Sequence, residues 1–172
     1  LQAVNDPVEE NYDALMSAGL LSGFGLGNVG CHLPHGMSYA VAGLVKDYAP
    51  EGWPTDHNMV PHGISVIVNS PAVFRKTGPA CPERHWQAAA AMGADLTDTK
   101  VEDGGDILAD QILGMMRETG IPNGLSGVGY SMDDLDALTD GSYIQKRLID
   151  NGPMPISRDE LKELFRDAMS YW

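Results

Sequence analysis

Hydrophobic residues recur every three or four positions through most of the chain, which is the spacing of amphipathic helices rather than of strands. In the first such segment, residues 7–22, the side chains of Tyr12, Leu15, Met16 and Leu20 fall at helical spacing. The glycine-rich sequence GFGLGNVG comes next. We therefore expect one helix that ends where this glycine-rich connector begins.

Later segments repeat the helical pattern. Pro61 and Pro82 stand at first helical positions, and Pro71 should break or kink the segment that Pro61 opens. Within that segment the run ISVIV could also form a strand by its β-propensity. The expected helices are roughly residues 35–45, PHGISVIVNSPAVF, PERHWQAAAAMGA, GGDILADQILGMMRETG, SMDDLDAL and RDELKELFRDAMSY.

Two of these helices are preceded by residues with the spacing of a capping box. Ser131 precedes Asp134 by three positions, and Ser157 precedes Glu160 by three positions. No stretch shows convincing strand alternation, and no internal repeat is present. Helices joined by short connectors predict an all-α, bundle-like fold, which we expect to form one helical metal-binding and catalytic domain over residues 1–172.

Residues 46–60, KDYAPEGWPTDHNMV, interrupt the helical pattern with two prolines, a glycine and several acids. Loops of this length in compact domains are commonly lids, binding loops or disordered segments. We expect the loop to cover a site, with Lys46 as a candidate partner for a substrate carboxylate.

Composition excludes several classes of function. The 172 residues are 43% hydrophobic, enough for one core or at most two small ones, and the formal charge is −13. Without a basic stripe, neither nucleic acid nor an anionic membrane surface is an expected partner. Cys31 and Cys81 form no CxxC pair and suit a reducing compartment. No apolar run is long enough to span a bilayer, and the chain begins without Met, which suggests a processed chain or a fragment.

Two histidines share an unusual local sequence. His35 and His62 each lie in the triplet PHG, 27 residues apart. A proline that opens a helix fixes the backbone of a histidine in the first turn, and the adjacent glycine admits close approach of a ligand or another backbone. Neutral imidazole is a common ligand of zinc and also suits iron. We predict that His35 and His62 are two ligands of one metal ion whose other ligands are not in this chain.

The remaining histidines are weaker candidates. His32 precedes His35 by three positions and is expected to be packed, whereas His57 and His85 are expected at the surface. Tyr39 follows His35 by four positions and so lies one turn along on the same face of the helix. Its hydroxyl could reach a metal-bound oxygen or a nicotinamide, or it could be a buried, hydrogen-bonded core group.

The sequence from Gly25 to Gly30 satisfies the pattern GxGxxG of dinucleotide-binding loops. That function requires a preceding strand and a following helix within a βαβ unit, and the surrounding pattern is helical instead. We interpret these glycines as small residues that allow two helices to pack closely.

Three long stretches resemble a known family. GFGLGNVGCHLPHGMSYAVAGLVKDY, VPHGISVIVNSPAVF and PERHWQAAAAMGAD are similar to the C-terminal half of iron-containing (group III) alcohol dehydrogenases, which have a dehydroquinate synthase-like fold. Within the family, HGMSY and the longer loop before the second PHG resemble the hydroxyacid-oxoacid transhydrogenase subgroup. The resemblance extends through GLSGVGYS to the final SRDELKELFRDAMSYW.

This resemblance implies a metal held by one Asp and three His in a cleft between two domains. His35 and His62 match two of those ligands. The other two, and the NAD(P)-binding α/β domain, lie upstream of this chain. The expected cofactors are Fe²⁺, or Zn²⁺ as its main competitor, and NAD(P) bound mainly by the N-terminal domain. The fragment alone is expected to be inactive.

Tyr39 departs from the family pattern, because many relatives carry His there, near the nicotinamide and the proton-relay path. A tyrosine hydroxyl can donate a hydrogen bond but does not exchange protons near neutral pH as histidine does. Hydride exchange between a hydroxyacid and an oxoacid has less need of net proton release. Tyr39 is thus the candidate catalytic and cofactor-binding residue.

The expected function is an NAD-linked, metal-dependent alcohol dehydrogenase domain acting in hydroxyacid–oxoacid transhydrogenation. The alternatives are a non-catalytic helical interaction module and a plain alcohol or maleylacetate-type reductase. The expected partners are a small hydroxyacid, oxoacid or alcohol and the protein's own N-terminal domain; a homo-oligomer is also compatible. The expected location is the bacterial cytoplasm or, in a eukaryote, the mitochondrial matrix.

Overall fold

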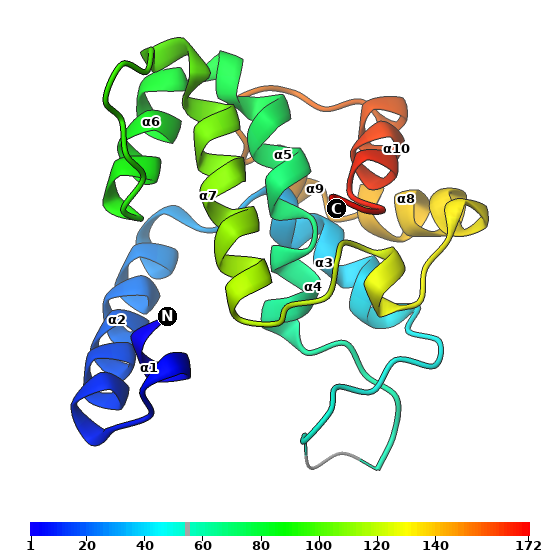
Figure 1. Ribbon diagram of the computed structural model, residues 1–172. Coiled ribbons are helices and arrows are strands. Elements are labelled where there is room, and N and C mark those ends of the chain that lie inside the picture. The colour runs from blue at the N-terminus through cyan, green and yellow to red at the C-terminus, as the bar shows by residue number, and fades with distance from the viewer. Residues whose placement is uncertain (54–55) are drawn as a thin grey trace. The chain divides into compact units, whose positions relative to one another are not determined.

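The computed structural model describes residues 1–53 and 56–172 (Figure 1). These residues form α-helices, short 3-10 helices and loops, and none of them forms a strand. The all-α prediction is confirmed, and the first four residues of the run ISVIV lie in α4 (His62–Ile67). The chain divides into two compact units, Leu1–Cys31 and His32–Trp172, which we describe separately.

The first unit contains α1 (Gln2–Asn5) and α2 (Glu9–Val29). The expectation that the helix stops before the glycine-rich sequence was wrong, because α2 continues through it to Val29. Glycine inside a helix costs only about 1 kcal/mol relative to alanine, so a long helix can continue through several glycines. The helix ends at Gly30, whose φ of 73° favours glycine.

The GxGxxG sequence therefore lies inside and at the end of a helix, without a preceding strand. This position agrees with the expectation that it is not a dinucleotide-binding loop. The expected close packing of two helices at these glycines was wrong for the described residues, because a Cβ on Gly25 or Gly27 would meet nothing within 4 Å. All of α2 is solvent-exposed or only partly covered, and its exposed side chains include Leu20, Leu21 and Phe24. Among the described residues, no single helix is both long enough and apolar enough to cross a membrane.

The second unit contains eight α-helices among its described residues. Four short 3-10 helices, Gly78–Ala80, Val101–Asp103, Ser126–Val128 and Met132–Asp134, connect or precede them. The α-helices are α3 (Leu33–Gly43), α4 (His62–Ile67), α5 (Ser70–Thr77), α6 (Pro82–Ala91), α7 (Gly104–Glu118), α8 (Leu135–Tyr143), α9 (Lys146–Ile149) and α10 (Arg158–Asp167).

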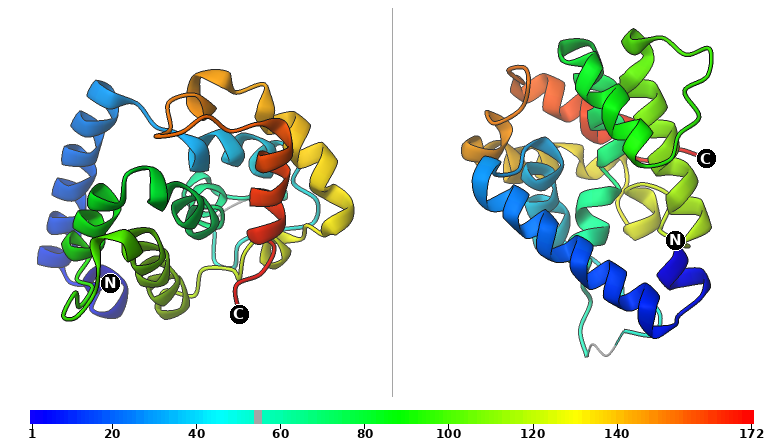
Figure 2. Two further views of the ribbon diagram at one scale, coloured as in Figure 1. Left: turned by 90° about the horizontal axis from the view of Figure 1, so that it is seen from above. Right: turned by 90° about the vertical axis from the view of Figure 1, so that its left-hand side faces the viewer.

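Helix α7 packs against α5 and α6 on one side of this unit, and α8 packs against α3 and α10 on the other (Figures 1 and 2). A continuous hydrophobic core runs between these groups. Its largest fully buried side chains include Phe165, Leu33, Met37, Met116 and Leu138.

The segment that Pro61 opens divides into α4 and α5, with the break at Val68 and Asn69. Pro71 stands in the first turn of α5. Proline has no backbone N–H, and in the first turn of a helix that group would have no partner within the helix. The predicted break in this segment is therefore confirmed, a few residues before the proline.

Two glycines allow α7 to approach the segment after α5. A Cβ on Gly105 would lie 2.7 Å from the Cα of Gly78, and a Cβ on Gly78 would lie 2.6 Å from the Cα of Gly105. Real Cβ atoms do not come this close to backbone, so both positions require glycine.

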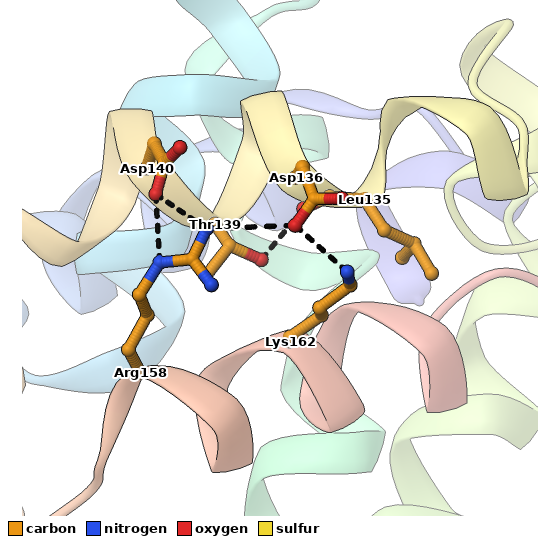
Figure 3. Close-up of polar contacts among 6 residues, drawn as sticks. All are labelled: Leu135, Asp136, Thr139, Asp140, Arg158 and Lys162. Atoms are coloured by element: carbon orange, nitrogen blue, oxygen red, sulfur yellow. Dashed lines mark hydrogen bonds and ion pairs between the residues drawn. The ribbon is translucent and has the colours of Figure 1, made fainter.

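Ion pairs join α8 to α10 on the surface (Figure 3). Arg158 lies 2.7 Å from Asp140, and Lys162 lies 2.7 Å from Asp136. Both predicted capping boxes are confirmed, the one at Ser131 before a 3-10 turn that leads into α8 and the one at Ser157 before α10.

Candidate metal centre

His35 lies in the first turn of α3. The backbone N–H of His35 donates to the His32 carbonyl at 2.9 Å, and the Ser38 hydroxyl donates back to the His35 carbonyl at 2.8 Å. A Cβ on the neighbouring Gly36 would lie 3.3 Å from the Ile149 side chain, so this glycine lets the helix start pack tightly against α9. These contacts fix the backbone from which the His35 imidazole projects.

His62 is the first residue of α4 and is held in the same way. Pro61 has the extended backbone of a helix N-cap, with φ −52° and ψ 143°. The Ser65 hydroxyl donates to the His62 carbonyl at 2.8 Å. Both histidines therefore occur in the sequence PHGxS, and in both the serine bonds back to the histidine three residues earlier.

The two imidazoles lie side by side. Their ring centroids are 5.4 Å apart, and the ring planes are inclined by 56°. Within the described part of the chain no hydrogen bond to either ring is present; His62 is exposed and His35 is partly buried. Burial, and next the nearby His62, lower the pKa of His35, which favours the neutral form that binds metals.

This geometry fits a metal ion for which the chain supplies two of the ligands. In the described segments, no group of three or more His, Cys, Asp or Glu side chains is arranged to hold a metal. Two neutral nitrogen donors leave at least two positions of a four-coordinate ion to other groups. The ligand roles of His35 and His62 remain predictions, but the structure brings the two side chains together as those roles require.

Tyr39 lies one turn after His35 on α3. Its side chain is 45% exposed, so it is not a core residue. The guanidinium of Arg147, which lies in α9, donates a hydrogen bond to the Tyr39 hydroxyl oxygen at 3.1 Å. That bond occupies a lone pair of the oxygen and leaves the phenolic proton for another acceptor.

His85 was wrongly expected at the surface, since only 7% of it is exposed. Its Nε2 and the Thr77 hydroxyl are hydrogen-bonded at 2.9 Å, and its ring meets Phe74 edge-on, with centroids 5.7 Å apart. The face of α6 that carries His85 packs against α5, which the sequence pattern did not indicate. His57, by contrast, is an exposed residue beside Asp56, as expected.

His32 is packed, as expected, but one of its atoms is unusual. The ring lies edge-on to Phe74, with centroids 6.1 Å apart. Its Nδ1 is buried and has no hydrogen-bond partner within residues 1–53 and 56–172. Burial, followed by His85 and His35, lowers the pKa of His32. A buried polar atom without a partner is rare in folded proteins and is often explained by a ligand or a water molecule.

A cavity of about 510 Å³ opens beside His32 within the second unit. Its walls come from α5, α6 and α7 and from the loop after α9. Most are apolar, while His32, His85 and Arg84 add polar groups. No local pattern of residues indicates this cavity, because its walls come from segments as far apart as residues 32 and 153.

The expected partner of a substrate carboxylate, Lys46, is already paired. Its Nζ lies 2.6 Å from the Asp134 carboxylate. The base of the loop that follows is held by a bond from the Asn58 side chain to the Lys46 carbonyl at 2.8 Å. Residues 54 and 55 of the expected 46–60 loop lie outside the described residues.

Comparison with known proteins identifies the class to which this helical unit and its histidine pair belong. The family model described as "Fe-containing alcohol dehydrogenase family, C-terminal" matches residues 1–169. The chain belongs to this family.

Its sequence relatives carry a more particular name. "Hydroxyacid-oxoacid transhydrogenase, mitochondrial" of Xenopus laevis is 43% identical over 99% of this chain, and the human protein of that name is 40% identical over the same share. The "probable" transhydrogenase of Dictyostelium discoideum is 42% identical over 92% of the chain. The chain spans only 37%, 37% and 29% of these three relatives, respectively.

Solved structures share the fold. A 1,3-propanediol oxidoreductase superposes with a TM-score of 0.74 at 24% identity, covering 88% of this chain and 36% of that one. An alcohol dehydrogenase from Oenococcus oeni gives a TM-score of 0.73 at 18% identity, covering 86% and 35%. The helical architecture therefore matches that of part of an alcohol dehydrogenase.

Proposed function

We propose that this chain is the C-terminal, metal-holding domain of an NAD-linked oxidoreductase that transfers hydride between a hydroxyacid and an oxoacid. The family membership supports the oxidoreductase class, and the names of the relatives support the substrate class. The observation that carries the proposal is the His35–His62 pair, with its rings 5.4 Å apart at the starts of two helices.

In this proposal His35 and His62 supply two nitrogen ligands to Fe²⁺ or Zn²⁺. A bound divalent cation would act as a Lewis acid that polarises the oxygen of the alcohol or carbonyl group. The remaining ligands and most of the NAD contacts would come from an N-terminal domain, for which the greater length of the relatives leaves room. The relatives' mitochondrial names favour the mitochondrial matrix as the location.

Tyr39 would position the reacting groups beside this metal. The bond from Arg147 holds the hydroxyl oxygen, and the phenolic proton can be donated to a substrate oxygen or to the nicotinamide amide. When one enzyme oxidises a hydroxyacid and then reduces an oxoacid, the proton lost by the first substrate is regained by the second. Tyr39 would then contribute a hydrogen bond rather than net proton release.

Deuterium transfer tests this proposal. The full-length gene product is incubated with a hydroxyacid deuterated at the carbinol carbon, an unlabelled oxoacid and a catalytic amount of NAD. Mass spectrometry should find deuterium in the hydroxyacid formed from the oxoacid. Deuterium that appears only in NADH would indicate a plain alcohol dehydrogenase, and no transfer at all would favour a non-catalytic helical module.

A further inference from the structure

We propose that the cavity beside His32 binds the non-reacting carboxylate end of the hydroxyacid or oxoacid, with Arg84 as its charged anchor. This inference rests on the proposed function and deepens it, because it assigns the residues that would distinguish a hydroxyacid from a neutral alcohol. All residues that line the cavity, including the polar residues His32 and Arg84, belong to the second unit.

One cavity residue, His32, lies close in the chain to the candidate metal ligand His35. His32 lines the cavity and stands one helical turn before His35, with its carbonyl accepting the backbone N–H of His35 at 2.9 Å. His32 therefore connects the cavity wall to the helix start that carries His35. A substrate whose hydroxyl-bearing carbon lies near His35 and His62 would direct its remaining chain past His32.

The cavity has the size and lining of a small-ligand site. Its volume of about 510 Å³ lies within the usual range of about 300–1,000 Å³ for ligand pockets. Phe74, Met92, Leu108 and Ile112 supply apolar surface for a methylene chain. Such walls bind the middle of a hydroxyacid but cannot by themselves accommodate its carboxylate, which needs a charged or hydrogen-bonding partner.

Arg84 supplies that partner. It lines the cavity from the exposed face of α6, and the only contact of its guanidinium recorded in the described segments is with the Gln87 side-chain oxygen, at 3.3 Å. Several other basic residues, among them Lys46 and Arg75, are already paired with carboxylates. A guanidinium binds a carboxylate through two parallel hydrogen bonds, which gives direction as well as charge.

The unpartnered Nδ1 of His32 is the second, independent observation. This atom is buried, and no group of the described residues forms a hydrogen bond with it. A polar group of a bound molecule, or a water that bridges to it, would provide the missing hydrogen bond. Arg84 and His32 would thus contact the two ends of the same ligand chain, across apolar walls.

The test uses the full-length gene product with a straight-chain hydroxyacid and the neutral alcohol of the same carbon number. Arg84→Gln should lower the ratio of kcat/KM for the hydroxyacid to kcat/KM for the alcohol at least tenfold, mainly through a higher KM for the hydroxyacid. Arg84→Lys should restore part of this ratio. Lys100→Gln is the control, because Lys100 is exposed, lies outside the cavity and carries the same charge.

A second readout does not depend on turnover. Calorimetry measures the affinity of the metal-free protein for a straight-chain carboxylate that lacks a hydroxyl group. Arg84→Gln should lower this affinity at least tenfold, and Lys100→Gln should leave it unchanged. An unchanged substrate ratio and unchanged carboxylate binding in Arg84→Gln would overturn the inference while the proposed function stands. Absence of hydride transfer from either substrate by the unmodified protein would overturn the proposed function, and the inference with it.

Discussion

Arg147 donates a hydrogen bond to the hydroxyl oxygen of Tyr39 at 3.1 Å, although the two residues are 108 positions apart in the chain. The contact joins the segment at α9 to the helix that carries His35. It holds the Tyr39 side chain at a partly exposed position, one turn from the candidate metal ligand. A hydroxyl held in this way is oriented before any substrate binds, which lowers the entropic cost of using it.

Tyr39→Phe should therefore lower kcat for hydroxyacid–oxoacid exchange by about tenfold, the effect of losing one hydrogen bond of about 1.4 kcal/mol. Steady-state kinetics of the full-length protein measures the change. Tyr143→Phe is a matched control, since it removes a hydroxyl from α8, outside the candidate centre. Unchanged turnover in Tyr39→Phe would rule out a catalytic role for this hydroxyl.

The approach of Gly78 to Gly105 predicts an effect on stability. Gly105→Ala would place a Cβ 2.7 Å from both the Gly78 Cα and the Phe74 carbonyl oxygen, so we expect a loss of about 1–3 kcal/mol in the free energy of unfolding. Gly114→Ala, on the same helix with open space around it, should instead stabilise by up to about 1 kcal/mol. Thermal unfolding monitored by circular dichroism compares the two variants. Equal effects would contradict the close packing described for α7.

Glu160 makes stability depend on acid pH. The Lys76 ammonium at 2.8 Å, together with the hydrogen bonds from Ser157, lowers the pKa of Glu160 from 4.5 to about 2. Because the folded-state pKa is the lower one, the unfolded chain binds more protons between these values. The stabilisation is therefore complete above pH 4.5 and is lost as the pH falls toward 2.

Glu160→Gln isolates this contribution, because glutamine keeps the capping-box hydrogen bond and removes the charge. The difference in unfolding temperature between wild type and Glu160→Gln should be largest above pH 4.5 and should shrink toward pH 2. Glu102→Gln, at an exposed acid without a recorded ion pair among the described residues, should show no such trend. A difference that is constant with pH would mean that the Lys76 pair contributes nothing.

Much of the fold was predictable because it depends on local pattern. The helices after Pro82 and Ser157 begin where proline chemistry and the capping box place them. The glycine-rich end of α2 was mispredicted because glycine is only a weak helix breaker, and the continuity of a long helix outweighed it.

The candidate site was predictable only in part. His35 and His62 were recognisable because their local sequences repeat, and local sequence sets the geometry of a helix start. The burial of His85, the bond from Arg147 to Tyr39 and the cavity around His32 depend on how distant helices pack. A periodic pattern identifies the faces of a helix but not the partner that each face meets.

The central claim is that His35 and His62 bind one metal ion together. X-ray absorption spectroscopy of the iron- or zinc-loaded full-length protein, combined with its metal content, tests this most directly. Wild type should hold about one ion per chain with nitrogen ligands of the imidazole type. His35→Ala and His62→Ala should each either bind much less metal or show one fewer imidazole ligand in the spectrum. His57→Ala should match wild type in both measurements. Full metal content and an unchanged imidazole signal in both His35→Ala and His62→Ala would contradict the account.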